Sequence, residues 1–358
     1  MKMTFRWYGQ NDDSVTLSQI RQIPNVSGVV GALFDVPVGE AWKEKDILNL
    51  KNTVNNAGLE LEVIESVNVH EDIKLGLPSR DKYIENYKTT IRRLAKYGIK
   101  VICYNFMPVF DWLRTNLAYP LEDGSNALCY IDELAKSTTP LELVKSTDSG
   151  SNGFTLPGWE PYRLAELQKL MEAYQNIDEE KLFENLEYFL KNIIPVCEEC
   201  DVKMAIHPDD PPWSIYGLPR IITCREYIER MLAMVDSPYN GLTLCSGSLG
   251  ANKNNNIPEL IRLFAGRIHF AHVRNIKFFG DKDFHEASHF SADGSLDLYE
   301  IMKAYHDIGF TGYIRPDHGR MIWDEKARPG YGLYDRALGI AYINGLWEAI
   351  EKENKENV

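Results

Sequence analysis

The sequence predicts a single (β/α)8 barrel, the TIM-barrel fold, that occupies residues 1–358 and carries long insertions after its fourth and fifth strands. Short apolar, β-branched runs alternate along the chain with longer amphipathic runs, which is the pattern of βα units and a parallel sheet. A length of 358 residues suits one such barrel with insertions. No glycine-rich phosphate-binding fingerprint follows the first strand, so the pattern disfavours an open sheet that binds a dinucleotide.

Eight runs are expected to form the barrel strands. They span residues 4–7, 28–32, 59–64, 100–106, 203–207, 241–245, 267–273 and 311–315. Helical patterns lie between them, among them residues 44–56, 81–96, 178–199, 258–264 and 296–306. Five glycines stand just before strands, where the C-cap of the preceding helix is expected: Gly58, Gly98, Gly241, Gly266 and Gly309.

Two connections are too long to be plain loops. Residues 107–176 separate the fourth strand from its helix and mix short helical pieces with aromatic residues and a Gly-Ser-Asn-Gly turn, so we expect an ordered lid or cap. Residues 209–224 follow the fifth strand and are rich in proline and aromatic residues. Both connections leave the C-terminal face of the barrel, where enzymes of this fold keep their chemistry.

Composition excludes several classes of protein. No apolar run approaches the roughly 20 residues of a membrane span, and the N-terminus lacks the apolar core of a signal peptide. The six cysteines are scattered, which favours reduced thiols, and we expect a cytoplasmic protein. A net charge of −13 argues against nucleic acid and anionic membranes as partners. The sequence leaves a homo-oligomer such as a dimer open.

Four residues with metal-binding side chains are expected at the C-terminal ends of consecutive strands. Side chains alternate between the two faces of a strand, and this parity points all four toward the barrel axis, where they can converge on one ion. Two imidazoles, one thiolate and one carboxylate suit zinc, iron(II) or manganese(II), and the sulfur by itself favours zinc or iron. The four candidate ligands are His207, Cys245, His272 and Asp317.

Each candidate ligand alone would be interpreted as structural, since a single histidine at a strand end is usually hydrogen-bonded and a single buried cysteine usually behaves as a small apolar residue. Their occurrence at four consecutive strand ends favours a metal site. His269 is out of phase with this set and is assigned to packing, whereas His285 and His289, in a loop near the barrel mouth, are minor candidates. Cys197 and Cys200 lie in a helix without a second pair, so a chelating or redox role is disfavoured.

Further candidates surround the predicted metal site. Arg274 and Arg315 could hold a substrate carboxylate through their forked donors, although salt bridges fit them nearly as well. His318 is suited to acid/base chemistry, and Tyr331, in a Pro-Gly turn, could relay protons or simply anchor the turn. Pro316 ends the last strand, and we expect the following turn to bring both Asp317 and His318 into one pocket.

Several separated motifs in this chain resemble those of the mannonate dehydratase family, from end to end. They are Phe5-Arg6-Trp7-Tyr8-Gly9, Tyr104-Asn105-Phe106-Met107-Pro108-Val109-Phe110-Asp111-Trp112 with Arg114-Thr115, Ala205-Ile206-His207-Pro208-Asp209-Asp210-Pro211-Pro212, Cys245-Ser246-Gly247-Ser248, Ile268-His269-Phe270-Ala271-His272-Val273-Arg274, and Arg315-Pro316-Asp317-His318-Gly319 followed by Pro329-Gly330-Tyr331. The resemblance implies a barrel related to the xylose isomerases and a manganese or iron(II) cofactor. It carries the family's metal ligands onto the four candidate ligands, and its acid/base residues onto His318 and Tyr331.

The reaction that the resemblance implies is the dehydration of D-mannonate to 2-dehydro-3-deoxy-D-gluconate in hexuronate (glucuronate) catabolism, so the implied partner is a small-molecule sugar acid. A base removes the C2 proton and the C3 hydroxyl leaves, while a divalent ion and an arginine stabilise the charge next to the carboxylate. The sequence does not assign the acid and the base between His318 and Tyr331. Three alternatives stay open: a metal-dependent sugar isomerase or epimerase on the same barrel, a metal-dependent DNA-repair nuclease, which the acidic charge disfavours, and a non-catalytic sugar-acid binder.

Overall fold

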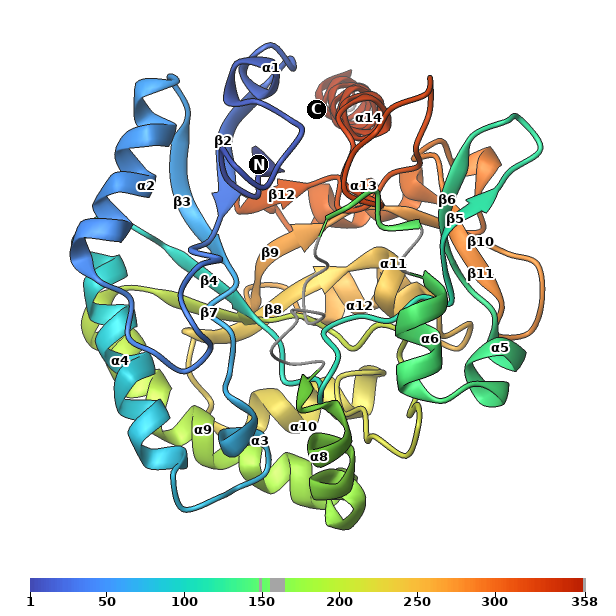
Figure 1. The fold of residues 1–358 in the computed structure, drawn as a ribbon. Helices are drawn as coiled ribbons and strands as arrows, with labels where there is room; N and C mark the ends of the chain where they lie inside the picture. Colours follow the sequence, from blue (N-terminus) through green and yellow to red (C-terminus); the bar gives the residue numbers. More distant parts are fainter. Residues whose placement is uncertain (148–149, 155–164, 357–358) are drawn as a thin grey trace.

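The computed structural model describes residues 1–147, 150–154 and 165–356, and its centre is a closed barrel of eight parallel strands (Figure 1). The strands follow one another around the barrel in chain order, and the last pairs with the first to close it. All eight predicted strands are present. They are β1 (Lys2–Arg6), β2 (Val26–Gly31), β3 (Glu60–Glu65), β4 (Val101–Tyr104), β7 (Lys203–Ile206), β8 (Asn240–Cys245), β9 (Ile268–His272) and β12 (Tyr313–Arg315).

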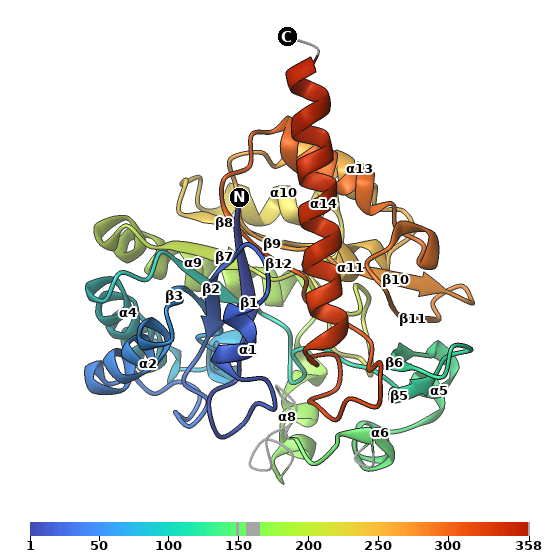
Figure 2. The ribbon, with the colours of Figure 1, turned by 90° about the horizontal axis from the view of Figure 1, so that it is seen from above.

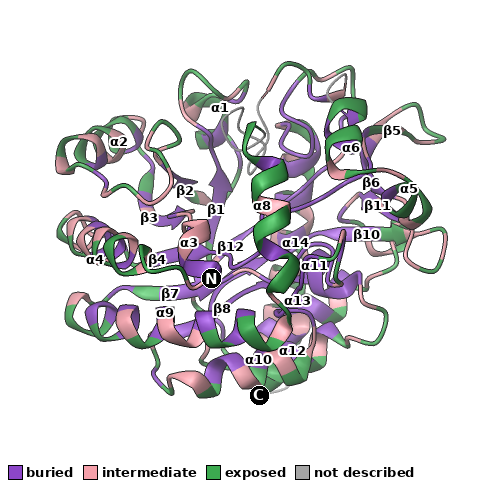
Figure 3. Ribbon diagram, turned by 60° about the horizontal axis from the view of Figure 1, so that its bottom comes forward, coloured by how far each residue is buried: buried purple, intermediate pink, exposed green. Residues whose placement is uncertain are grey.

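The long helices surround the barrel and turn their apolar faces toward it, so that buried residues lie on the inner sides of these helices (Figure 3). The long helices are α2 (Glu44–Asn56), α4 (Arg80–Lys96), α9 (Glu179–Cys200), α10 (Arg225–Met234), α13 (Leu298–Asp307) and α14 (Tyr334–Glu356). The shorter ones are α1 (Leu17–Arg21), α3 (Glu71–Lys74), α5 (Asp132–Ser137), α6 (Pro140–Thr147), α8 (Leu167–Ala173), η2 (Tyr174–Asn176), α11 (Ser246–Gly250), α12 (Ile257–Leu263) and η3 (Ser291–Asp293). Figure 2 shows α14 extending past the rest of the molecule to the C-terminus. No described helix is both long and apolar enough to cross a membrane.

Strand parity holds in the barrel core. Leu242 and Leu244 pack in the large cluster between β8 and the helices, as expected. Thr243 points the other way and donates its hydroxyl hydrogen to Cys103 Sγ, 3.1 Å away. The interior of the barrel is filled by a small set of residues from alternate positions: Val30, Val63, Val101, Cys103, Ala205 and Phe270.

One of the five glycine predictions is wrong. Gly58, Gly98 and Gly309 adopt a positive φ directly after the C-caps of α2, α4 and α13, and Gly266 adopts one two residues after the C-cap of α12. Gly241 instead lies inside β8, where a Cβ atom would come within 2.3 Å of His269 Nε2 and of the Arg267 carbonyl oxygen. The glycine is needed there for close packing against the next strand, which a single-sequence pattern does not distinguish from a helix end.

The inserted segments form a second, antiparallel sheet that the sequence analysis did not predict. Its order is β10-β11-β6-β5, and it stands beside the barrel at the right of Figure 1. The strands β5 (Asn116–Pro120) and β6 (Asn126–Tyr130) belong to the predicted lid, whereas β10 (Asn275–Phe278) and β11 (Phe284–Ala287) follow β9. Residues 107–176 are therefore tied to a later part of the chain. Residues 148–149 and 155–164 of the predicted lid lie outside the described residues.

Candidate active site

The C-terminal ends of four neighbouring strands bring the four candidate metal ligands together. His207 directly follows β7, Cys245 ends β8, His272 ends β9, and Asp317 lies two residues beyond β12. Each residue offers one ligand atom to the group, and these atoms all lie within 4.8 Å of one another. His207 is partly exposed and the other three are buried. Because a metal ion needs ligand atoms that converge from several directions, this arrangement can hold one divalent cation.

The chemistry of the donor set fits a metal. His207 Nδ1 lies 2.7 Å from the Pro208 carbonyl oxygen, which can only accept, so Nδ1 carries the proton and Nε2 keeps its lone pair. Ser248 directs both its backbone N–H and its hydroxyl toward Cys245 Sγ, at 3.4 and 3.1 Å. His272 Nδ1 is buried and has no hydrogen-bond partner among the described residues. His272 Nε2 accepts the Arg315 Nε–H at 3.0 Å and therefore keeps a lone pair, so two imidazoles, a thiol and a carboxylate face one position where a cation can bind.

Asp317 reaches this cluster because the strand stops before it. Pro316 follows the last residue of β12, and Asp317 adopts a left-handed backbone with φ of 56°. Both Asp317 and His318 then line one cavity, as the turn at Pro316 predicted. Burial by itself raises the pKa of Asp317, but His318, Arg315, His272 and Arg274 together hold this pKa well below its ordinary value. The carboxylate is therefore ionised and available as a ligand.

His318 is held between a carboxylate and a phenol. Its Nδ1 lies 3.2 Å from Glu286 Oε1, and its Nε2 lies 2.8 Å from the Tyr331 hydroxyl. A carboxylate can only accept, so Nδ1 donates to Glu286. When Nε2 carries no proton, it accepts the hydrogen bond from Tyr331. Trp112 packs edge-on against the imidazole, with ring centroids 5.7 Å apart. The hydrogen bond to Glu286 therefore selects the tautomer in which His318 Nδ1 carries the proton and Nε2 is free to accept one.

The two partners of His318 differ in their protonation. Burial alone would raise the pKa of Glu286, but Arg274, His318 and Arg114 lower it to about 2, so this carboxyl is ionised near neutral pH. Burial raises the pKa of Tyr331 well above its ordinary value, and Tyr8 and Asp317 raise it further. Tyr331 therefore stays a neutral phenol with a proton to donate.

A buried ion-pair network connects the catalytic candidates. Its members alternate in charge along one chain of contacts, with nitrogen–oxygen distances from 2.6 to 3.2 Å: Asp210, Arg114, Glu286, Arg274, Asp317, Arg315, Glu65 and Arg6. Arg274 also binds Asp210, at 2.6 Å. Such a network is costly to desolvate and stabilises the fold only when each charge has its partners, so it fixes the geometry of the site.

Arg274 and Arg315, predicted to bind substrate, occupy different places in this network. Arg315 lines the cavity and donates Nε–H to His272 Nε2 at 3.0 Å. Arg274 lies behind the cavity wall, with its guanidinium against Asp210, Glu286 and Asp317. Its role toward a substrate carboxylate stays a prediction.

Several residues of the site were not recognised in the sequence. Arg114 and Asp210 stand within two of the motifs that carry the family resemblance, so a search for buried ion pairs among motif residues could have found them. Glu286 had no such indication, because β11 was not predicted. His285 lies in β11 and stacks on Tyr119 and Phe279, and His289 is buried with Nε2 3.0 Å from the Val273 carbonyl oxygen. Neither of the two minor candidates lines the cavity.

The cavity at the barrel mouth encloses about 520 Å³ of empty space, including adjoining solvent. Residues from β1, β3, β4 and β12, and from the loops that follow these strands and β7, form its wall: Arg6, Tyr8, Glu65, Ser66, Cys103, Asn105, Met107, Asp111, Trp112, His207, Asp210, Arg315, Asp317, His318 and Tyr331. This lining is mostly polar and carries both signs of charge, which suits a small, hydroxylated, anionic ligand.

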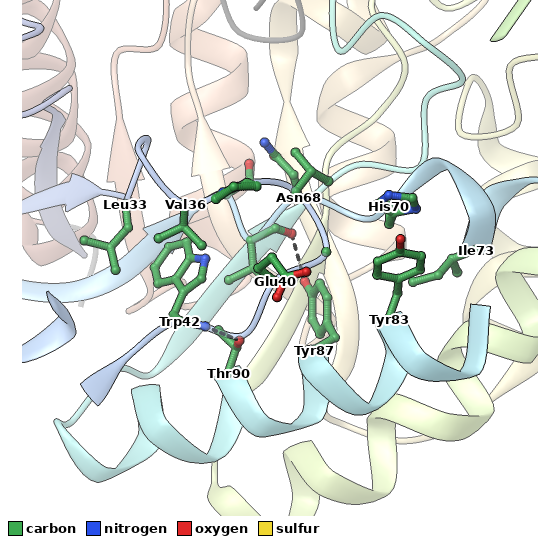
Figure 4. A pocket seen from close by; sticks show the side chains of 15 residues that line it. Leu33, Val36, Glu40, Trp42, Asn68, His70, Ile73, Tyr83, Tyr87 and Thr90 are labelled. Carbon is green, nitrogen blue, oxygen red and sulfur yellow. Dashed lines mark hydrogen bonds between the residues drawn. The ribbon is translucent and has the colours of Figure 1, made fainter. Parts of the chain in front are cut away.

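A second cavity lies between α4 and the loops that follow β2 and β3 (Figure 4). His70 stacks on Tyr83 there with ring centroids 3.6 Å apart, and its Nδ1 accepts the Asp72 backbone N–H at the start of α3. Tyr87 donates its hydroxyl hydrogen to the Val67 carbonyl oxygen. Because these polar groups serve the local packing, His70 is assigned to structure.

Fold and site together define a class: a (β/α)8-barrel enzyme with a His/Cys/His/Asp cluster suited to a divalent metal and an acid/base pair beside it. Comparisons with known proteins place the chain within this class. The sequence pattern of the family described as D-mannonate dehydratase (UxuA) matches residues 1–357. The chain belongs to the D-mannonate dehydratase family, and it is accordingly a hydro-lyase.

Individual relatives agree with this assignment. A mannonate dehydratase of Thermotoga petrophila is 70% identical over 357 residues, which cover 99% of each chain. A mannonate dehydratase of Lachnoclostridium phytofermentans is 62% identical over 358 residues, which cover 99% of this chain and 100% of the relative. The crystal structure of a mannonate dehydratase from Streptococcus suis superposes with a TM-score of 0.90 at 47% identity, covering 99% of this chain and 96% of that one. An L-ribulose 3-epimerase at 12% identity, covering 99% of this chain and 97% of that one with a TM-score of 0.54, shares the fold alone.

Proposed function

We propose that this protein dehydrates D-mannonate to 2-dehydro-3-deoxy-D-gluconate in hexuronate (glucuronate) catabolism. The observation that carries the proposal is the cluster of four metal ligands directly beside the His318–Tyr331 pair, in a chain of this family. Loss of water from a sugar acid needs a base at C2, an acid at the C3 hydroxyl and stabilisation of charge at the carboxylate. The cavity holds a candidate for each task.

His207, Cys245, His272 and Asp317 would hold a manganese(II) or iron(II) ion. When bound, such an ion supplies Lewis-acid stabilisation of the negative charge that develops next to the carboxylate. Ser248 supports this role, because its backbone N–H donates to Cys245 Sγ at 3.4 Å and helps to orient the sulfur within the cluster.

His318 takes the C2 proton in the proposed reaction, because Glu286 fixes the tautomer that leaves Nε2 basic. Tyr331 gives its proton to the departing C3 hydroxyl, since its raised pKa keeps it neutral before the reaction. The 2.8 Å hydrogen bond between the two then returns the proton from His318 to the phenolate. The pair thereby transfers one proton from C2 to the leaving hydroxyl and regains its starting state.

Arg315 is proposed to contact the substrate carboxylate, since it lines the cavity beside Asp317. Arg274, the other arginine expected to do so, has carboxylates on three sides, which supports a role in positioning Asp317 and Glu286. The segment 107–176 is proposed to act as a lid. Trp112 and Asp111, near its start, line the cavity.

The test is to incubate the protein, loaded with manganese(II) or iron(II), with D-mannonate and to analyse the product. Dehydration releases a 2-keto-3-deoxy acid that is one water lighter than the substrate. A sugar isomerase or epimerase on this fold would conserve mass, so a product of unchanged mass would refute the proposal.

Two further properties are proposed. A cytoplasmic location is supported by the six cysteines, which are all free. A homo-oligomer such as a dimer is supported by large apolar side chains left on the surface, among them Trp323 at 69% exposure and Leu338 at 49%. Light scattering of the purified protein measures the oligomeric state directly.

A further inference from the structure

Arg6 ends β1 at the wall of the active-site cavity and was not among the predicted site residues. It is 5% exposed, so it is buried. Its guanidinium stacks over the rings of Tyr8 and Phe34, at 4.9 and 5.6 Å from their centroids, which fixes its direction.

Two donor groups of Arg6 find no acceptor in the part of the chain that the structure describes. Nε and Nη1 are buried and have no hydrogen-bond partner among the described residues. Nη1 lies 3.2 Å from Glu65 Oε2 as an ion pair without hydrogen-bond geometry. Arg315 Nη1, on the same cavity wall, is also buried without a partner. Buried N–H groups of charged side chains rarely stay unpaired, so a ligand with acceptor oxygens is expected beside them.

Charge supports the same conclusion. Within the buried ion-pair network Arg114 contacts two carboxylates and Arg274 three, but Arg6 stands at the end and contacts only Glu65. Arg315 shares Glu65, and its other carboxylate, Asp317, belongs to the metal cluster. Once Asp317 binds a cation, two guanidinium groups are left with one carboxylate. The cavity wall formed by Arg6 and Arg315 therefore carries one unbalanced positive charge, which an anionic ligand would neutralise.

We propose that Arg6 and Arg315 together bind the carboxylate of the sugar acid, with Arg6 as the residue that selects an acid over an uncharged polyol. The forked donors of two guanidinium groups match the two oxygens of a carboxylate. Glu65 holds both arginines in place and orients them toward the cavity. This inference rests on the proposed function and names the group through which the substrate is recognised.

The experiment measures equilibrium binding of D-mannonate and of D-mannitol, in which a CH₂OH group replaces the carboxylate, to the manganese-loaded protein. We expect Arg6→Gln to weaken D-mannonate about 10- to 100-fold, the range for a charge-assisted hydrogen bond, and to change D-mannitol by less than about threefold. Arg6→Lys keeps the positive charge but lacks the forked guanidinium donors, so it should weaken D-mannonate binding by a smaller factor. If the glutamine variant fails to fold, the lysine variant provides the test. Lys2→Gln, an exposed change on the same strand, is the matched control and should alter neither ligand.

Equal weakening of both ligands in the Arg6 variants, or no weakening of D-mannonate, would overturn the assignment. Turnover is read separately. If the unaltered protein binds D-mannonate but releases no 2-keto acid, the proposed reaction is wrong while the binding comparison still decides the role of Arg6. If Arg6 acts as proposed, KM for D-mannonate rises by a larger factor than kcat falls.

Discussion

Replacement of His318 by asparagine separates catalysis from metal binding more cleanly than any other single change. The asparagine Nδ2 occupies nearly the position of the imidazole Nδ1 and can keep the 3.2 Å hydrogen bond to Glu286. The basic Nε2, which faces Tyr331 at 2.8 Å, is removed. The four metal ligands are untouched, so the bound metal should stay at one ion per chain.

The expected loss in kcat is about 10²- to 10⁴-fold, the usual contribution of a positioned general base, which corresponds to about 2.7 to 5.5 kcal/mol in the barrier. The free energy of unfolding should fall by only about 1–2 kcal/mol, from lost contacts with the rings of Trp112 and Tyr331. The assay measures 2-keto acid release from D-mannonate, with metal content determined by elemental analysis of the same sample.

A matched control is His285→Asn, a partly exposed histidine in β11 that does not line the cavity. It should keep full activity. The reasoning fails if His318→Asn retains kcat within tenfold of the unaltered protein, or if it loses the metal together with its activity.

Three further changes test the rest of the site. Tyr331→Phe keeps the ring against Tyr8 and His318 but removes the proton donor, so kcat should fall about 100-fold while KM changes little. Steady-state kinetics measures both constants, and an unchanged kcat would contradict the role of Tyr331 as the acid. Cys245→Ser should lower manganese affinity by about tenfold or more in equilibrium dialysis, and equal affinity would remove the thiolate from the ligand set. Glu286 has a pKa of about 2 in the folded protein against 4.5 ordinarily, so it stabilises the fold above pH 4.5, and this contribution of about 3 kcal/mol is lost as pH falls toward 2. Urea unfolding of the metal-free protein between pH 2 and 6 should therefore show a shallower pH dependence in Glu286→Gln, and profiles of the same steepness would refute the assignment.

The barrel and the grouping of the four candidate ligands were predictable from the sequence alone, because both depend on local periodicity. Alternation along each strand decides which side chains face the axis, and it placed Thr243 inside and Leu242 outside before any contact was known. The same periodicity put three candidate ligands at strand ends, and the proline after β12 explained how Asp317 and His318 share one cavity.

The side chains that surround those residues come from segments far apart in the sequence, so they could be identified only in the folded chain. The second sheet joins β6 to β11 across more than 150 residues of chain, and its short strands carry too little pattern to be found alone. Glu65 and Arg315 are 250 residues apart, and nothing local in either segment identifies the partner. Charges buried in pairs follow no sequence period, because each is placed by whichever element packs against it. For that reason the orientation of His318 by Glu286, and the unpaired donors of Arg6, became visible only when the folded chain brought their partners together.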